Sequence, residues 1–304
     1  MDDGQTSNTV IKGITFKGGK VKSNNSYPGG GSLYIGANTD VKFVDCVWDA
    51  NSVDNYYGGA ITIEQSSDAS FVGCTFKNNY AEHESSTVYG GAIWIRYPSS
   101  KAQMNSPIVF KQTKFINNYI KAKHGAYGGA VYSDRSTEFI NCLFVKNYVI
   151  AGNGANANDG HEGVAGALFA EPAWYNGSSY DGGTTKIINS TFHGNYADVK
   201  TNNGNAWAGT IAYGRYKDAS SQTYLFNTIV SGSRALRGGS DFNNNNAEDR
   251  IIGSSNNSPS LNTYSSNFVG SAGTNWFKTA DETYDIVPVY TDTTKEDYRL
   301  SDKS

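Results

Sequence analysis

The sequence predicts an all-β protein folded as a right-handed parallel β-helix, a solenoid of roughly eight coils with long inserted loops. Three observations predict it: a composition of strand and turn residues, a repeat of variable length, and a motif that keeps its register within each repeat. The 304 residues include 34 Gly, 21 Tyr and 14 Phe against only 6 Pro. Short strands and tight turns suit this composition better than helices do.

Charge and hydropathy exclude several classes of partner. A net charge of −3 without a basic run gives no footprint for nucleic acid and no polybasic membrane anchor. No run approaches the roughly 18 apolar residues of a membrane helix. We therefore expect no nucleic-acid partner and no membrane insertion of this domain.

The chain is expected to form one domain over residues 1–304. Its first residues lack the charged and apolar regions of a signal peptide. A strand-like segment at 10–16 begins almost at once, and the chain stops abruptly after residue 301. We therefore expect a fragment of a longer protein.

The first repeated unit is a pair of small residues followed by an apolar alternation. The second small residue falls at positions 31, 59, 91, 129, 166, 209 and 239, which are 28, 32, 38, 37, 43 and 30 residues apart. Fixed strands joined by loops that accept insertions produce such variable periods. Regular coils are expected over about 10–245, and an irregular last coil with a cap over about 246–304.

A second unit lies between successive small pairs and consists of a small residue, an aromatic residue two later and Asn three after that. The aromatic residues are Trp48, Phe76, Phe115, Phe144 and Phe192, and the asparagines are Asn51, Asn79, Asn118, Asn147 and Asn195. With an apolar residue and a turn former upstream, each coil is expected to supply about three short strands. Stacked coils pair each strand with its neighbours at about 4.8 Å, so the rings form an interior stack and the amides a ladder.

These motifs carry a family resemblance. Gly-Gly-Ala-Ile at 58–61 and 90–93, combined with Phe-x-x-Asn at 76–79 and 115–118, resembles the repeat of chlamydial polymorphic outer-membrane proteins. Related repeats occur in bacterial secreted right-handed β-helix proteins of the pectin-lyase-like superfamily. The resemblance covers roughly residues 10–245 and implies the fold, with secretion or surface display. It selects no activity, because that superfamily contains adhesins, lyases, hydrolases and passive scaffolds.

Cysteine and histidine are expected to be structural. Cys46, Cys74 and Cys142 share the small-residue column, which predicts reduced core thiols. A disulfide between Cys46 and Cys74 would need a distorted dihedral angle, because stacked parallel strands point both side chains the same way. His124 and His161 each stand five residues before the second residue of a small pair and could meet at a metal, but such variable loops need not superpose. No metal site and no cofactor is predicted.

The strands that begin at the small pairs contain the candidate binding site. With Ile61 and Ile93 inside, alternation turns the following residue of each strand outward. Four of these outward residues are aromatic, namely Tyr34, Trp94, Tyr132 and Phe169. A row of exposed rings would be a flat apolar platform, which soluble proteins seldom leave unused, and rings stack on sugar faces.

Two residues further along, the outward column contains Glu64, Arg96, Asp134 and Glu171. Neighbouring carboxylates could supply the acid and base of glycoside hydrolysis, with Arg96 steadying charge. A lyase would instead need a base and a cation or metal at a uronate. A purely structural alternative is a cross-strand salt-bridge ladder, with the rings covered by the long loops at 81–89, 120–127 and 149–163.

The sequence therefore predicts a secreted or cell-surface bacterial domain that mediates adhesion or carbohydrate binding. The alternative is a polysaccharide lyase or glycoside hydrolase that uses the same sheet. The expected partner is a polysaccharide or a glycan of a host or cell surface, bound by a monomer. Whether catalysis occurs is left open by the residues.

Overall fold

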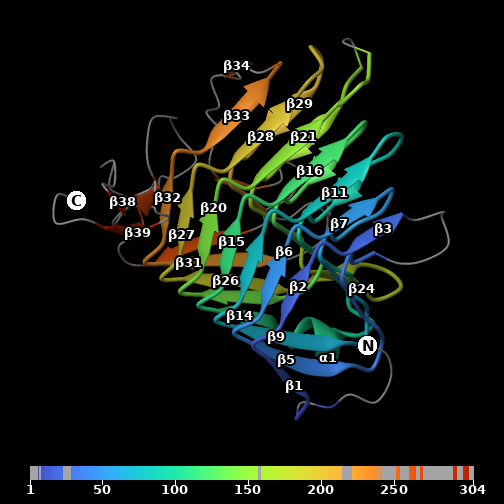
Figure 1. The fold of residues 1–304 in the computed structure, drawn as a ribbon, viewed down its shortest axis with the longest axis vertical. Coiled ribbons are helices and arrows are strands. Elements are labelled where there is room, and N and C mark those ends of the chain that lie inside the picture. The colour runs from blue at the N-terminus through green and yellow to red at the C-terminus, as the bar shows by residue number, and fades with distance from the viewer. Residues whose placement is uncertain are drawn as a thin grey trace.

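The chain folds as a right-handed parallel β-helix, as its sequence predicts (Figure 1). The computed structural model describes residues 6, 8–22, 29–156, 159–213 and 221–238, and the backbone of strands at 240–241, 251–253, 260–264, 268–269, 290–292 and 297–300. The coils stack in chain order, from blue β1–β3 to orange β31–β33 in Figure 1. Most of the expected last coil and cap over 246–304 lies outside the described residues.

Three sheets, named A, B and C in chain order, each contain eight strands. Sheet A contains β1 (Val10–Lys12), β5 (Asp40–Val44), β9 (Asp68–Val72), β14 (Ile108–Lys111), β19 (Thr137–Ile140), β26 (Thr184–Ile188), β31 (Gln222–Phe226) and β36 (Ser260–Tyr264). Sheet B contains β2 (Thr15–Lys17), β6 (Val47–Asp49), β10 (Thr75–Lys77), β15 (Lys114–Ile116), β20 (Leu143–Val145), β27 (Thr191–His193), β32 (Ile229–Ser231) and β37 (Phe268–Val269). Sheet C contains β3 (Lys20–Lys22), β7 (Ser52–Asp54), β11 (Tyr80–His83), β16 (Tyr119–Ala122), β21 (Tyr148–Ala151), β28 (Tyr196–Val199), β33 (Arg234–Arg237) and the antiparallel β34 (Ser240–Asp241).

Two further sheets complete the coils. Sheet D, which begins at the small pairs, contains β4 (Leu33–Ile35), β8 (Ile61–Ile63), β13 (Ile93–Ile95), β18 (Val131–Ser133), β23 (Leu168–Ala170), β30 (Ile211–Tyr213) and β35 (Ile251–Gly253). Sheet E contains β12 (Val88–Tyr89), β17 (Ala126–Tyr127), β22 (Glu162–Val164) and β29 (Asn205–Trp207). The expectation of about three strands per coil was therefore too low, because sheets A to D each supply a strand to most coils and the loops between sheets C and D add a fifth.

The interior consists of stacked rings and a buried amide ladder, in the predicted register. Phe76 pairs with Trp48 and Phe115, with ring centroids 4.5 and 5.1 Å apart and planes within 8°. Along the ladder, each asparagine from Asn51 to Asn147 donates from Nδ2 to Oδ1 of the ladder asparagine on the next coil, at 2.9–3.0 Å. The motif therefore fixes the register of successive coils.

The small pairs mark a close approach of the backbones of neighbouring coils. Gly90, the first of its pair, has φ +67°, which favours glycine. A Cβ on Gly91, the second, would lie 2.0 Å from the carbonyl oxygen of Gly129 on the next coil. The repeat therefore needs a residue without a side chain at the second position, whatever the length of the loop before it.

Two insertions follow sheet D. The short helix α1 (Lys101–Met104) follows β13, and an antiparallel hairpin of β24 (Ala173–Tyr175) and β25 (Tyr180–Gly182) follows β23. Lys101 on the helix forms an ion pair with Asp181 on the hairpin, at 3.1 Å. A second antiparallel pair, β38 (Tyr290–Asp292) and β39 (Asp297–Leu300), lies near the end of the chain.

Candidate functional site

The predicted aromatic row exists in sheet D, but its rings are not the exposed platform that the sequence suggested. Trp94 pairs with Tyr132, and Tyr132 with Phe169, on successive coils. These three side chains are only 8%, 4% and 5% exposed. Tyr34, on the first strand of the sheet, is partly buried. The prediction of an open aromatic surface on sheet D was therefore wrong.

Sheet E and the residues next to it cover these rings. The ring of Tyr57 meets Trp94 edge to face at 4.8 Å, Tyr89 lies 4.6 Å from Tyr132, and Tyr127 lies 5.5 Å from Phe169. The rings form one cluster with Val164, Ala165, Ala208 and Ala212. The strands of sheet E lie in or beside the long loops. The structure therefore matches the alternative in which those loops cover the rings of sheet D.

A signal for this fifth sheet is present in the sequence. An aromatic or β-branched residue stands directly before each small pair in five successive coils: Tyr57, Tyr89, Tyr127, Val164 and Trp207. Such residues favour strands, and their constant position indicates a second ordered column next to sheet D. Together with the small pairs, this column predicts that a second layer covers the rings of sheet D.

The charged column extends sheet D by one residue per coil. The amide of Arg96 donates to Ile63 O at 3.0 Å, and that of Asp134 to Ile95 O at 3.0 Å. The Arg96 guanidinium holds both carboxylate oxygens of Glu64 through Nη1, at 2.6 and 2.7 Å. This pair matches the salt-bridge alternative for that part of the column.

The carboxylates of the column differ in access to solvent. Glu64 is 5% and Glu171 1% exposed, whereas Asp134 is partly exposed. The Arg96 guanidinium carbon lies 5.4 Å from the Trp94 ring, which joins the charged column to the buried ring row. The structure thus places the predicted site residues in two neighbouring columns, most of which lie beneath the surface.

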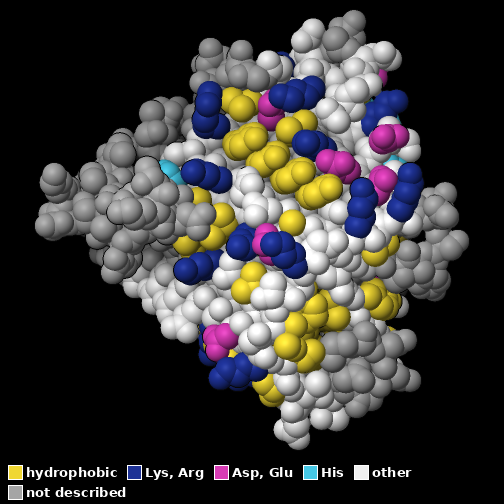
Figure 2. Space-filling model, viewed as in Figure 1, with side chains coloured by type: hydrophobic (Ala, Val, Ile, Leu, Met, Phe, Trp, Pro, Cys, Tyr) yellow, Lys and Arg dark blue, Asp and Glu magenta, His cyan; other side chains and the backbone are white. Residues whose placement is uncertain are grey.

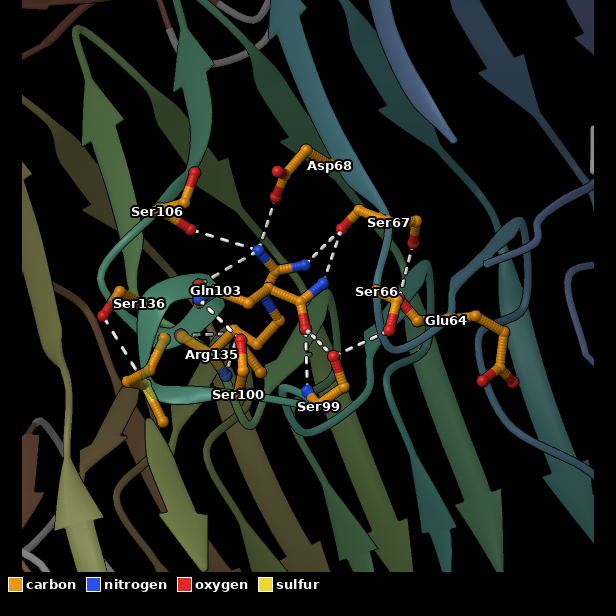
Figure 3. A network of polar contacts seen from close by, with 12 residues as sticks. Glu64, Ser66, Ser67, Asp68, Ser99, Ser100, Gln103, Ser106, Arg135 and Ser136 are labelled. Atoms are coloured by element: carbon orange, nitrogen blue, oxygen red, sulfur yellow. Dashed lines mark hydrogen bonds and ion pairs between the residues drawn. The ribbon is translucent and has the colours of Figure 1, made fainter. Parts of the chain in front are cut away.

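A polar network built on Arg135 lies directly beside this column (Figure 3). The guanidinium of Arg135 is fully buried and donates to Ser67 O, to Asp68 Oδ1 at 2.5 Å and to Ser106 O at 3.1 Å. It also donates to Gln103 O at 3.3 Å, which ties α1 to the coils. Through these contacts the network anchors the insertion that contains α1 to the coils.

A different aromatic row is accessible on the outer face of sheet C. Tyr80, Tyr119, Tyr148 and Tyr196 pair in register, with centroids 4.8–4.9 Å apart and planes within 4°. All four side chains are partly exposed. Figure 2 shows hydrophobic side chains in a continuous row across this sheet, flanked by charged groups. We call these four residues the tyrosine ladder.

The sequence contained a signal for the tyrosine ladder that the motif analysis did not use. Tyr follows the ladder asparagine directly in four of the five copies, and Ser52 takes its place in the first. Because the asparagine points inward at the corner, the residue after it begins the next strand facing outward. The full motif is therefore Phe-x-x-Asn-Tyr.

The tyrosine ladder presents mainly hydroxyl groups and ring edges, because each inner ring is covered on both faces by its neighbours. Burial raises the pKa of Tyr119 well above its ordinary value, with the neighbouring Tyr148 and Glu82 adding to the shift. Burial, then Tyr148 and Asp198, raise the pKa of Tyr196 to about 12. These hydroxyls therefore stay protonated at neutral pH and can both donate and accept hydrogen bonds.

A polar groove of about 520 Å³ continues the surface beyond the tyrosine ladder. It is lined by Glu82, His83, Glu84, Lys121, Lys123, Asn153 and Gly154. Lys121 connects the two features, since its Nζ lies 5.1 Å from the Tyr119 centroid and 3.8 Å from Glu82 Oε1. Tyrosine ladder and groove form one continuous surface on sheet C.

The thiols and imidazoles give no second site. Cys46, Cys74 and Cys142 are free and buried, as predicted. His124 and His161 do meet, with centroids 5.0 Å apart and rings edge to face at 76°. Over the described part of the chain, no three His, Cys, Asp or Glu side chains come together as metal ligands.

Comparisons with protein-family models, with curated proteins and with solved structures give no match to this chain. Within the described residues, no helix is long and apolar enough to span a membrane. Function must therefore be argued from the surfaces themselves.

Proposed function

We propose that this β-helix is a glycan-binding or adhesion domain and that it binds through the tyrosine ladder and the groove on sheet C. The observation behind the proposal is the ladder itself: four stacked, partly exposed tyrosines at the spacing of the coils. Repetition at one residue per coil suits a partner that is itself a repeating polymer. A pyranose residue of an extended polysaccharide is about as long as the step between coils.

The chemistry of the tyrosine ladder fits sugar hydroxyls. Protonated phenol groups donate and accept hydrogen bonds, and aromatic ring edges have partial positive charge that favours oxygen atoms. The ladder also has an uncovered end, because the position next to Tyr80 on the preceding coil is Ser52. A serine is too small to cover a ring, so one ring face is available for stacking on a sugar.

Secretion or display at the cell surface is part of this proposal. It rests on the resemblance of the repeat to those of chlamydial polymorphic outer-membrane proteins and of the pectin-lyase-like superfamily. The parallel β-helix supports the resemblance at the level of architecture. It also supports the role, because a stiff solenoid holds a long binding surface in one plane.

We favour binding over cleavage because two carboxylates of the charged column are buried, one of them in an ion pair. Glu64 is held by Arg96, and Glu171 is 1% exposed. A general acid or base has to reach the scissile bond within hydrogen-bond distance, directly or through a water molecule. A lyase or hydrolase acting through Glu64, Asp134 or Glu171 stays a prediction.

The test is a screen of the purified protein against neutral and acidic polysaccharides, scored for retention and for release of reducing or unsaturated ends. The double variant Tyr119→Phe/Tyr148→Phe keeps the stacked rings and removes two hydroxyls, so retention should weaken about tenfold or more. The matched control is Tyr175→Phe on the inserted hairpin, where the ring is 54% exposed.

The outcomes separate the alternatives. Retention that weakens only in the tyrosine-ladder variant, without product release, supports the proposal. Release of products would select an enzyme instead. A protein that retains no polysaccharide, or whose retention is equal in the two variants, would show that the ladder is not a glycan site.

A further inference from the structure

The faces of sheets B and C are positively charged although the whole chain is not. The first seven strands of each sheet contain eight Lys and Arg residues, which are Lys17, Lys20, Lys22, Lys77, Lys114, Lys121, Arg234 and Arg237. They contain only four acidic residues, which are Asp49, Asp54, Glu82 and Asp198. The chain as a whole has a formal charge of −3, whereas these strands have more basic than acidic residues.

Each of the four acidic groups already has a lysine partner. Asp49 lies 3.6 Å from Lys17 and 3.7 Å from Lys77, so one carboxylate serves two ammonium groups. The other pairs are Asp54 with Lys22, Glu82 with Lys121, and Asp198 with Lys200. No acidic group on these strands is thus left to neutralise further lysines.

Three lysines around the tyrosine ladder have no such partner. Within the part of the chain that the structure describes, Lys114, Lys123 and Lys146 have no carboxylate within 4.0 Å. Lys146 lies in the turn two residues before Tyr148, and Lys114 begins the strand before Tyr119. Lys123 lines the groove.

The field of these lysines acts on nearby groups. Burial lowers the pKa of His193, and the charge of Lys146 lowers it further. Burial likewise lowers the pKa of His161, with His124 and then Lys123 adding to the shift and Asp159 opposing it. Lys123 shares the groove with Glu82 and Glu84, whereas Lys146 is exposed on the turn before the tyrosine ladder, where its charge can meet an approaching anion.

From this arrangement we infer that the glycan bound along the tyrosine ladder is polyanionic, with carboxylate or sulfate groups on its sugars. The inference rests on the proposed function and names the class of ligand. The tyrosine hydroxyls and the open ring face contact the sugar rings, while Lys114, Lys146 and Lys123 pair with anionic substituents on either side. An ammonium group on a flexible stem suits such substituents, which vary in position along a polymer.

The assignment has a clear electrostatic signature. Exposed lysines attract a polyanion through long-range forces that added salt screens. Binding should therefore be tight at low ionic strength, should weaken steeply as salt rises, and should be much weaker for a neutral glycan. Hydrogen bonding and stacking on the tyrosines alone would depend little on salt.

The experiment compares a sulfated polysaccharide with its chemically desulfated form, and polygalacturonate with its methyl ester, at low and high salt. The variant Lys114→Gln/Lys146→Gln removes two positive charges from the strand and the turn that precede the tyrosine ladder in their coils. The matched control Lys42→Gln/Lys111→Gln removes two from the outer face of sheet A, where both lysines are exposed. We expect the first variant to bind the sulfated polymer about tenfold more weakly at low salt and the control to bind like the parent.

The remaining outcomes would overturn either the polyanion assignment or the proposed function. Equal binding of charged and neutral forms, independent of salt, would leave glycan binding in place and overturn the polyanion assignment. Equal weakening in both variants would also overturn it, because the effect would be one of net charge. Duplex DNA bound as tightly as the sulfated glycan would show a general cation surface rather than a glycan site. Binding of no polysaccharide at all would remove the proposed function itself.

Discussion

The side chain of Asn118 connects three coils through its amide. Its Nδ2 donates to Phe76 O on the preceding coil and to Asn147 Oδ1 on the next, both at 2.9 Å. Its Oδ1 accepts from the backbone and side-chain nitrogens of Asn79, at 3.1 and 2.9 Å. All these groups are buried, so none can turn to water for a replacement partner.

Replacing this amide tests the ladder at a single residue. Asn118→Ala removes the acceptor of the Asn79 backbone amide and one of the two acceptors of its side-chain amide, and should lower the free energy of unfolding by about 1–3 kcal/mol. Denaturant melts monitored by circular dichroism give the value, with Lys111→Ala at an exposed position of the same coil as the control. An unchanged melt would mean that the ladder contributes nothing net.

Phe115 is expected to matter more, because a ring and not only hydrogen bonds is lost. It stacks on Phe76 and Phe144 at 5.1 and 4.5 Å and meets Phe110 edge to face at 5.6 Å. Phe115→Ala should cost about 3–5 kcal/mol through lost burial and a cavity. The same melts measure it, and a loss smaller than that of Asn118→Ala would contradict the ranking.

The thiols offer a test of the core that needs no substitution. Burial raises the pKa of Cys74 to about 11 and that of Cys142 to about 12. At neutral pH both stay protonated, and the thiolate is the reactive form. The native protein should resist a thiol reagent and take up label at three sites after unfolding without reductant. Only one labelled site would establish a disulfide.

At the scale of elements, sheet E changes what the ring row of sheet D does. Trp94 is 8% exposed and packs against Tyr56 and Tyr57, so its ring belongs to a second small core between two sheets. Trp94→Ala should therefore destabilise the protein by about 3–5 kcal/mol, seen as a lower melting temperature, and leave glycan retention per folded molecule unchanged. A variant that melts like the parent but has lost retention would return the binding site to sheet D.

The tyrosine ladder of sheet C should reveal itself at alkaline pH. Because the folded-state pKa values of Tyr119, Tyr148 and Tyr196 lie above the ordinary value of 10.0, the neutral ring is the form that folding favours. This contribution to stability is complete below pH 10 and is lost as pH rises through the folded-state values. Spectrophotometric titration should show these tyrosines ionising late, and Tyr119→Phe should remove part of the late phase. Ionisation of every tyrosine near pH 10 in the folded protein would contradict the shifts.

At the scale of the whole molecule, the repeat motif predicted the architecture because its requirements are local. Gly91 must lack a side chain to let Gly129 approach, and Asn118 must reach the asparagines above and below, whatever happens in the loops. These constraints recur once per coil and can be counted in a sequence. Fold, register and core were therefore predictable.

The surface was harder to predict, because exposure depends on where insertions fold. Alternation correctly turned Trp94 away from the main core, yet nothing in its own strand shows that the segment ending at Tyr57 lies over it. The buried carboxylate of Glu64 likewise depends on its ion pair with Arg96, which lies 32 residues away in the chain. Tyr119 is partly exposed on sheet C, and only its place after Asn118 signals it.

The central claim is that the tyrosine ladder of sheet C, and not the ring row of sheet D, faces the glycan. Hydroxyl-radical footprinting read by mass spectrometry tests it directly, with and without a bound acidic polysaccharide. We predict that Tyr119 and Tyr148 are oxidised in the free protein and protected in the complex, while Trp94 and Tyr132 are scarcely oxidised in either. Strong oxidation of Trp94 in the free protein, with protection on binding and no change at Tyr119, would contradict the account.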